Sequence, residues 1–142
     1  MPKPSTPEKH RLLIVEDNAD IAELLVIRLA LAGYTTLVAR NVDEAKGAVF
    51  SFRPTGVLLD IGLPDGTGFD VLKSIKETAK VNDIPVLMLT ARQAMADIRR
   101  ALDLGAADYV TKPFDDQKLL QRVARLLGLP IPAIRTEKSM LR

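Results

Sequence analysis

The sequence contains no cysteine, only 4% of its residues are aromatic, and no long apolar run interrupts it. Without cysteine the chain can form neither a disulfide framework nor a thiolate metal site, which is compatible with a reducing compartment. The first ten residues, MPKPSTPEKH, lack the apolar stretch of a secretory signal. No apolar run approaches the ~20 residues that a membrane-spanning helix needs. We therefore expect a cytoplasmic protein with no membrane association.

The sequence also lacks a large excess of charge of one sign, because the formal net charge is only +2. A charge this small does not by itself argue for nucleic-acid binding. The basic residues near the two ends are Lys3, Lys9, Arg11, Arg125, Arg135, Lys138 and Arg142. The C-terminal segment has no aromatic residues to stack on bases, so we expect no direct nucleic-acid binding by this chain. We expect a flexible arm over residues 1–10, with a solvated His10, and a tail or linker over residues 129–142.

What the sequence does contain is an alternation of apolar runs with amphipathic segments. The runs predict strands at 12–15, 35–39, 56–60, 84–89 and 108–111, and the segments between and after them predict helices. Helix-start residues support these assignments, namely Asn18 or Asp17, Asn41 with Glu44, and Asp115. The third helix is expected at about 69–79 and the fourth at about 93–104.

Short connections between alternating strands and helices indicate a parallel sheet that is covered on both faces, with right-handed crossovers. We predict one α/β domain over residues 11–128, with a doubly wound, five-stranded (βα)5 sheet. The expected strand order is 2-1-3-4-5, as in flavodoxin-like folds. In such a sheet ligands bind in the crevice at the carboxyl ends of the strands.

Isolated polar residues stand where the predicted strands end. Glu16 and Asp17 follow the first strand and Asp60 ends the third, while Thr90 and Lys112 follow the fourth and fifth. Carboxylates are hard oxygen ligands of the kind that Mg²⁺ prefers, and a lysine neutralises phosphate charge. Three carboxylates, a hydroxyl and an ammonium group therefore predict a site for a hard cation and a phosphoryl group.

The segments LLIVEDN, VLLDIGLPDGTG, LMLTA and YVTKPF resemble the receiver domain of two-component response regulators. The resemblance covers residues 11–128. It implies that Asp60 accepts a phosphoryl group from a sensor histidine kinase or a histidine phosphotransfer protein, with assistance from Thr90 and Lys112. It further implies an Mg²⁺ ion held by Glu16, Asp17, Asp60 and the backbone carbonyl of Gly62. Such a protein catalyses only its own phosphorylation and dephosphorylation, and is not a turnover enzyme.

The same resemblance implies how the signal leaves the domain. Thr90 and Tyr109 would act as a switch, and the face built from the fourth helix, fifth strand and fifth helix would change shape. That face would contact a downstream protein or an attached output domain, in a monomer or a phosphorylation-dependent homodimer. The Lys112-Pro113 bond is expected to be cis, and the positions of Gly62 and Arg92 are expected to tune the lifetime of the phosphate. Tyr109 could also be a half-buried residue without a switching role.

Other classes of protein place different residues in such a crevice. A phosphatase of the haloacid dehalogenase type normally has a second aspartate two residues after the first, where this chain has Gly62. A flavodoxin-like nucleotide binder needs a phosphate cradle after the first strand, where Glu16 and Asp17 would repel a metal-free phosphate. A degenerate receiver, acting only as an interaction module, would lack part of the set that is present here. DNA binding would require an output domain outside this chain.

Overall fold

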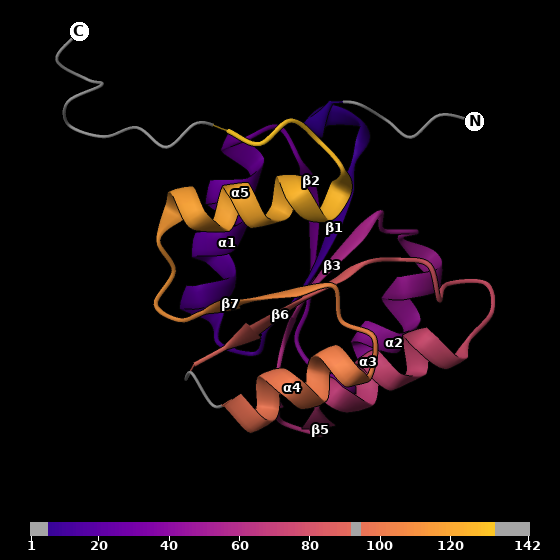
Figure 1. Cartoon of the computed structure of the whole chain (residues 1–142). Helices are drawn as coiled ribbons and strands as arrows, with labels where there is room; N and C mark the ends of the chain where they lie inside the picture. Colours follow the sequence, from indigo (N-terminus) through magenta and orange to yellow (C-terminus); the bar gives the residue numbers. More distant parts are fainter. Residues whose placement is uncertain (1–5, 92–94, 133–142) are drawn as a thin grey trace, which may run out of the picture.

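The computed structural model describes residues 6–91 and 95–132, which form a parallel sheet between two layers of helices (Figure 1). The sheet contains β1 (Arg11–Val15), β2 (Thr35–Ala39), β3 (Gly56–Asp60), β6 (Val86–Thr90) and β7 (Asp108–Thr111). Its strand order is β2-β1-β3-β6-β7, with every pair parallel. The predicted flavodoxin-like order is therefore confirmed.

Side chains alternate along the central strands and so build two hydrophobic cores, one on each side of the sheet. Leu13 and Val15 of β1 face the first core, whereas Leu12 and Ile14 face the second. All four are fully buried. This burial on both faces is the reason the strands have continuous apolar sequences instead of an alternating pattern.

Three helices cover the first core and two cover the second (Figure 1). The first layer contains α2 (Val42–Ser51), α3 (Gly68–Glu77) and α4 (Met95–Asp103), and the second contains α1 (Ala19–Leu31) and α5 (Asp116–Leu127). The side chains of Asn18, Asn41 and Asp115 accept hydrogen bonds at the N-termini of α1, α2 and α5, as their sequence predicted.

The third helix differs from its expected bounds at both ends. It starts at Gly68 because Thr67 is its N-cap, and Thr67 and Asp70 form a reciprocal capping box. It ends at Glu77 and not at Ala79, since Thr78 has extended backbone angles. The expected start of the fourth helix near Gln93 lies outside the described residues, and α4 is described from Met95.

The loop between β3 and α3 is a small antiparallel hairpin. Its strands are β4 (Gly62–Leu63) and β5 (Gly66–Thr67), with Gly62 opposite Thr67 and Leu63 opposite Gly66. The sequence predicted a tight loop here but not a hairpin. The hairpin matters because it extends from the carboxyl end of β3, where the candidate site lies.

The prediction that His10 is solvated is wrong. Its side chain is only 3% exposed, and Nδ1 lies 2.8 Å from Oγ1 of Thr55. Residues 7–9 form a 3-10 helix, and the backbone of His10 accepts a hydrogen bond from Thr35. Part of the expected flexible arm thus continues directly into the first strand of the sheet.

The chain also remains in contact with the domain after α5. Leu129 is 6% exposed, and Nε2 of Gln121 donates to the carbonyl of Pro132 at 3.1 Å. The segment at 129–132 therefore packs back along α5. In the part of the chain that the structure describes, no helix has the length and apolar character to cross a membrane.

Candidate functional site

The three carboxylates predicted from the strand ends converge at one edge of the sheet. One oxygen each from Glu16, Asp17 and Asp60 lie within 4.8 Å of one another. Glu16 and Asp60 are buried, at 1% and 8% exposure, whereas Asp17 is exposed. The convergence follows from the topology, since β1 and β3 are parallel neighbours and present their carboxyl ends side by side.

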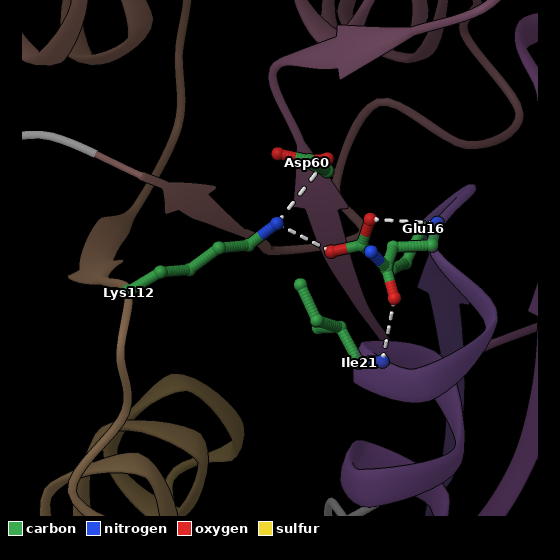
Figure 2. A network of polar contacts seen from close by, with 5 residues as sticks. Glu16, Ile21, Asp60 and Lys112 are labelled. Carbon is green, nitrogen blue, oxygen red and sulfur yellow. Dashed lines mark hydrogen bonds and ion pairs between the residues drawn. The ribbon is translucent and has the colours of Figure 1, made fainter.

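Lys112 brings a positive charge to this cluster from the loop after β7. Its Nζ lies 2.5 Å from Oε1 of Glu16 and 3.3 Å from Oδ2 of Asp60, so it points between the two carboxylates (Figure 2). Its backbone N–H donates to the carbonyl of Thr90 at 2.7 Å, and the Lys112-Pro113 peptide bond is cis, as expected. The lysine is thereby fixed at both its backbone and its ammonium group.

Glu16 is held at both of its carboxylate oxygens. Oε1 accepts from Lys112, and Oε2 accepts from the backbone N–H of Asn18 at 3.2 Å. Burial nevertheless raises the pKa of Glu16 above its ordinary value, and the negative charge of Asp60 raises it further, while Lys112 and the Asn18 N–H lower it. Loss of hydration on burial is therefore the main reason why the charged form of Glu16 is disfavoured.

Thr90 ends β6 next to β3 and is 4% exposed. In the register of the sheet Asp60 pairs with Leu89, so Thr90 lies one residue beyond Asp60 at the same edge. Tyr109 lies in β7, opposite Met88, and packs half-buried against the first core. The structure thus places the two predicted switch residues on the adjacent strands β6 and β7, with Thr90 at the strand end and Tyr109 in register with Met88. Their switching role stays a prediction.

Gly62 lies two residues beyond Asp60, at the start of β4. A Cβ built on Gly62 would meet no atom within 4 Å, so a side chain at this position would extend into open space. Its backbone carbonyl stays an expected metal ligand. Arg92, the other residue expected to tune the lifetime of the phosphate, lies outside the described residues.

The donor set suits a magnesium ion. Mg²⁺ binds hard oxygen ligands and usually keeps several waters, so it needs a few protein oxygens beside open space. The three clustered carboxylates provide the oxygens, and the exposed Asp17 leaves the cluster accessible to waters. A bound cation would also favour the charged form of Glu16, which burial disfavours.

Gly68 supports the site in a way that the sequence did not reveal. A Cβ at this position would lie 2.2 Å from the backbone oxygen of Asp60, closer than any real contact. The N–H of Gly68 also donates to the carbonyl of Ile61 at 2.7 Å. The run of three glycines predicted a tight loop, but only the folded chain shows that α3 begins directly against Asp60.

Asp65 is a second residue that sequence reasoning missed. Its Oδ1 accepts from the N–H of Val42 at 2.7 Å and its Oδ2 accepts from that of Asp43 at 3.1 Å. Both partners belong to the first turn of α2, more than twenty positions earlier in the chain. Within its own loop Asp65 resembles an ordinary turn residue, so no local signal indicates this contact.

Comparison with known proteins gives one consistent family. Residues 12–124 match the model of the response regulator receiver domain. The chain is 36% identical over 116 residues to the phosphate regulon transcriptional regulatory protein PhoB of Pseudomonas aeruginosa, covering 82% of this chain and 51% of PhoB. It is 41% identical over 119 residues to the DNA-binding dual master transcriptional regulator RpaA of Synechocystis, covering 82% and 48%. The chain thus spans about half the length of these curated relatives.

Solved structures agree with the sequence relatives. The chemotaxis protein CheY4 of Vibrio cholerae superposes with a TM-score of 0.79 at 27% identity, covering 83% of this chain and 98% of CheY4. The receiver domain of the sensor histidine kinase PA1611 of Pseudomonas aeruginosa gives 0.78 at 26% identity, covering 84% and 98%. That second structure contains a magnesium ion coordinated in its active-site cleft.

Proposed function

This chain belongs to the response regulator receiver family, and from that premise we propose that Asp60 accepts a phosphoryl group from a phosphohistidine. The donor is a sensor histidine kinase or a histidine phosphotransfer protein. The observation that carries this proposal is the ammonium group of Lys112, which lies between Asp60 and Glu16 in a cluster of three carboxylates. A carboxylate nucleophile beside a fixed positive charge is suited to phosphoryl transfer.

In this reaction an Asp60 carboxylate oxygen attacks the phosphorus atom in line with the departing imidazole. A P–O bond forms, the P–N bond of the phosphohistidine breaks, and the electron pair and a solvent proton go to the imidazole of the donor protein. Lys112 neutralises charge on the phosphoryl oxygens, and the hydroxyl of Thr90 donates a hydrogen bond to one of them. His10 is not a donor, because it is buried against Thr55 near the amino end of β1.

We propose that Glu16, Asp17, Asp60 and the backbone carbonyl of Gly62 hold Mg²⁺. The bound ion would screen the repulsion between the attacking carboxylate and the anionic phosphate. The carboxylate cluster supports this assignment, as does the magnesium ion in the related PA1611 receiver domain. The chain acts only on its own aspartate, so we do not assign it turnover of other substrates.

The proposed output is a change of shape at the surface formed by α4, β7 and α5. The phosphoryl group draws Thr90 inward, and the ring of Tyr109 takes the vacated space between the two neighbouring strands. Phosphorylation of Asp60 thus changes the conformation of a surface away from the phosphorylation site. This face would contact a downstream protein or an attached output domain, in a monomer or a phosphorylation-dependent homodimer.

The relatives differ in what accompanies the receiver, since the match covers 98% of the CheY4 chain. PhoB and RpaA are transcriptional regulators of which this chain matches about half. In such an arrangement DNA binding belongs to the output domain, and the receiver controls it. We propose that the receiver itself makes no direct contact with nucleic acid.

The test is intact-mass spectrometry after incubation with Mg²⁺ and acetyl phosphate, with Asp60→Asn as the control. We expect one base-labile phosphoryl adduct that requires the metal and is absent from the control. A folded wild-type protein with no adduct, or an Asp60→Asn variant that is labelled equally, would refute the assignment of Asp60. The remaining function would then be that of an interaction module.

A further inference from the structure

The hairpin after β3 is attached to α2 through one side chain at its tip. Asp65 accepts hydrogen bonds from the first two N–H groups of α2, those of Val42 and Asp43. These groups have no partner within the helix, and Asn41 already caps α2 through the N–H of Glu44. Asp65 is thus a second cap for α2 that comes from a different part of the chain.

The contact between Asp65 and α2 favours the ionised form of the Asp65 carboxylate. The hydrogen bond from Val42 lowers the pKa of Asp65 below its ordinary value, and the hydrogen bond from Asp43 acts in the same direction. A carboxylate also interacts favourably with the positive end of a helix dipole. The tip of the hairpin therefore remains attached to α2 across the neutral pH range.

The base of the hairpin is fixed separately. Gly68 packs against the backbone oxygen of Asp60, and its N–H closes the loop onto Ile61. The middle is tightly enclosed, since a Cβ at Gly66 would lie 2.8 Å from a carboxylate oxygen of Asp70 and 3.1 Å from Val42. Between base and tip the hairpin strands are only two residues long, and so short a ladder has little stability of its own.

Gly62 lies on this hairpin, between the fixed base and the attached tip. We infer that Asp65 is a positioning residue for the proposed metal site, because it holds in place the hairpin that carries the Gly62 carbonyl two residues beyond Asp60. The inference rests on the proposed Mg²⁺ site, to which it adds a residue that does not contact the ion. It also makes α2 a structural support of that site.

The test compares Asp65→Ala with Asn41→Ala, which removes the other cap of the same helix and leaves the hairpin attached. Isothermal titration calorimetry on the full chain, without phosphodonor, gives the Mg²⁺ dissociation constant of each variant. We expect Asp65→Ala to weaken Mg²⁺ binding roughly tenfold, as for residues that orient a metal ligand, while Asn41→Ala binds like the wild type. Asp65→Asn should restore part of the affinity, because its amide oxygen can still accept one bond.

Hydrogen exchange followed by mass spectrometry supplies a readout that is independent of the metal. Asp65→Ala should exchange faster at residues 61–67 than the wild type, whereas Asn41→Ala should exchange faster in α2 alone. Equal Mg²⁺ affinity in Asp65→Ala and the wild type would overturn the inference and leave the proposed site intact. If Asn41→Ala weakened Mg²⁺ binding as much as Asp65→Ala, Asp65 would act only as a cap of α2, and the inference would be wrong. A wild-type protein that binds no Mg²⁺ would refute the proposed site, and this inference with it.

Discussion

The ammonium group of Lys112 lies 2.5 Å from the carboxylate of Glu16, although 96 positions separate the two residues in the chain. The pair joins the loop after β7 to the end of β1, across the carboxyl edges of β3 and β6. Lys112 is therefore a stabilising counter-charge in the metal-free protein as well as a candidate ligand for phosphate. Its two roles can be separated experimentally.

Lys112→Ala should destabilise the metal-free protein at pH 8, because it leaves Glu16 buried beside Asp60 without a cation. We expect a loss of about 2 kcal/mol, below the roughly 3–5 kcal/mol of a fully buried pair, because Glu16 can bind a proton instead. Removing Lys112 raises the folded-state pKa of Glu16 further above its unfolded value, so the free energy of unfolding of the variant falls as pH rises. The stability difference from the wild type should therefore be smaller at pH 5.5 than at pH 8. Urea denaturation in EDTA at both pH values measures this.

A control for that variant is Arg28→Ala, which breaks an ion pair with Asp116 in which the two side chains are 39% and 46% exposed. An exposed pair of this kind contributes about 0–1 kcal/mol, with little change between the two pH values. If Lys112→Ala proved as stable as Arg28→Ala, the stabilising role of Lys112 would be wrong.

Gly68→Ala should disturb the candidate site directly. The new methyl group would meet the backbone of Asp60 and Ile61, and neither can move as a flexible side chain would. We expect a loss of about 2–3 kcal/mol in urea denaturation, the upper range for overpacking, together with slower phosphorylation by acetyl phosphate. Gly62→Ala is the control for stability, because its methyl group enters open space, and it should change stability by less than about 1 kcal/mol.

Gly47→Ala should stabilise the protein. Gly47 lies in the exposed middle of α2, and a Cβ there would meet nothing within 4 Å. Alanine in a helix interior is favoured over glycine by roughly 0.5–1 kcal/mol. Thermal and urea denaturation should both show the gain, and unchanged or lower stability would mean that the middle of α2 is not a regular exposed helix in solution.

The contribution of Asp65 to stability should depend on pH in the acid range. Its pKa in the folded protein lies below the unfolded value of 3.8, so the contribution is complete above that value and is lost as pH falls through the folded-state pKa. The stability difference between the wild type and Asp65→Asn should therefore be constant from pH 5 to 7 and shrink below pH 4. A difference that grows on acidification would contradict the hydrogen bonds to α2.

The sequence could predict the site because its main residues follow strands whose order obeys a general rule. Glu16, Asp60, Thr90 and Lys112 each follow a run of apolar residues, and a parallel sheet brings the ends of those runs together. Helix caps such as Asn41 and Asp115 were equally predictable, since their partners lie within three residues. Local pattern and topology together were sufficient for this part.

Contacts between remote segments that do not lie at the carboxyl ends of strands were not predictable in this way. His10 was expected in solvent because it precedes the first strand, yet Thr55, 45 positions later, forms its hydrogen-bond partner. The roles of Asp65 and Gly68 likewise depend on backbone groups brought close by tertiary structure. Composition and hydrophobic periodicity do not indicate which residues form such tertiary contacts.

The sheet separates the two hydrophobic cores, and β7 lies at its edge with β6 as its one neighbour in the described sheet. Tyr109 packs on the first core and the adjacent Val110 on the second. A sliding or tilting of β7 would therefore break backbone hydrogen bonds to a single strand while repacking both layers at once. A displacement of this one edge strand would therefore reach the helices on both sides of the sheet at the same time.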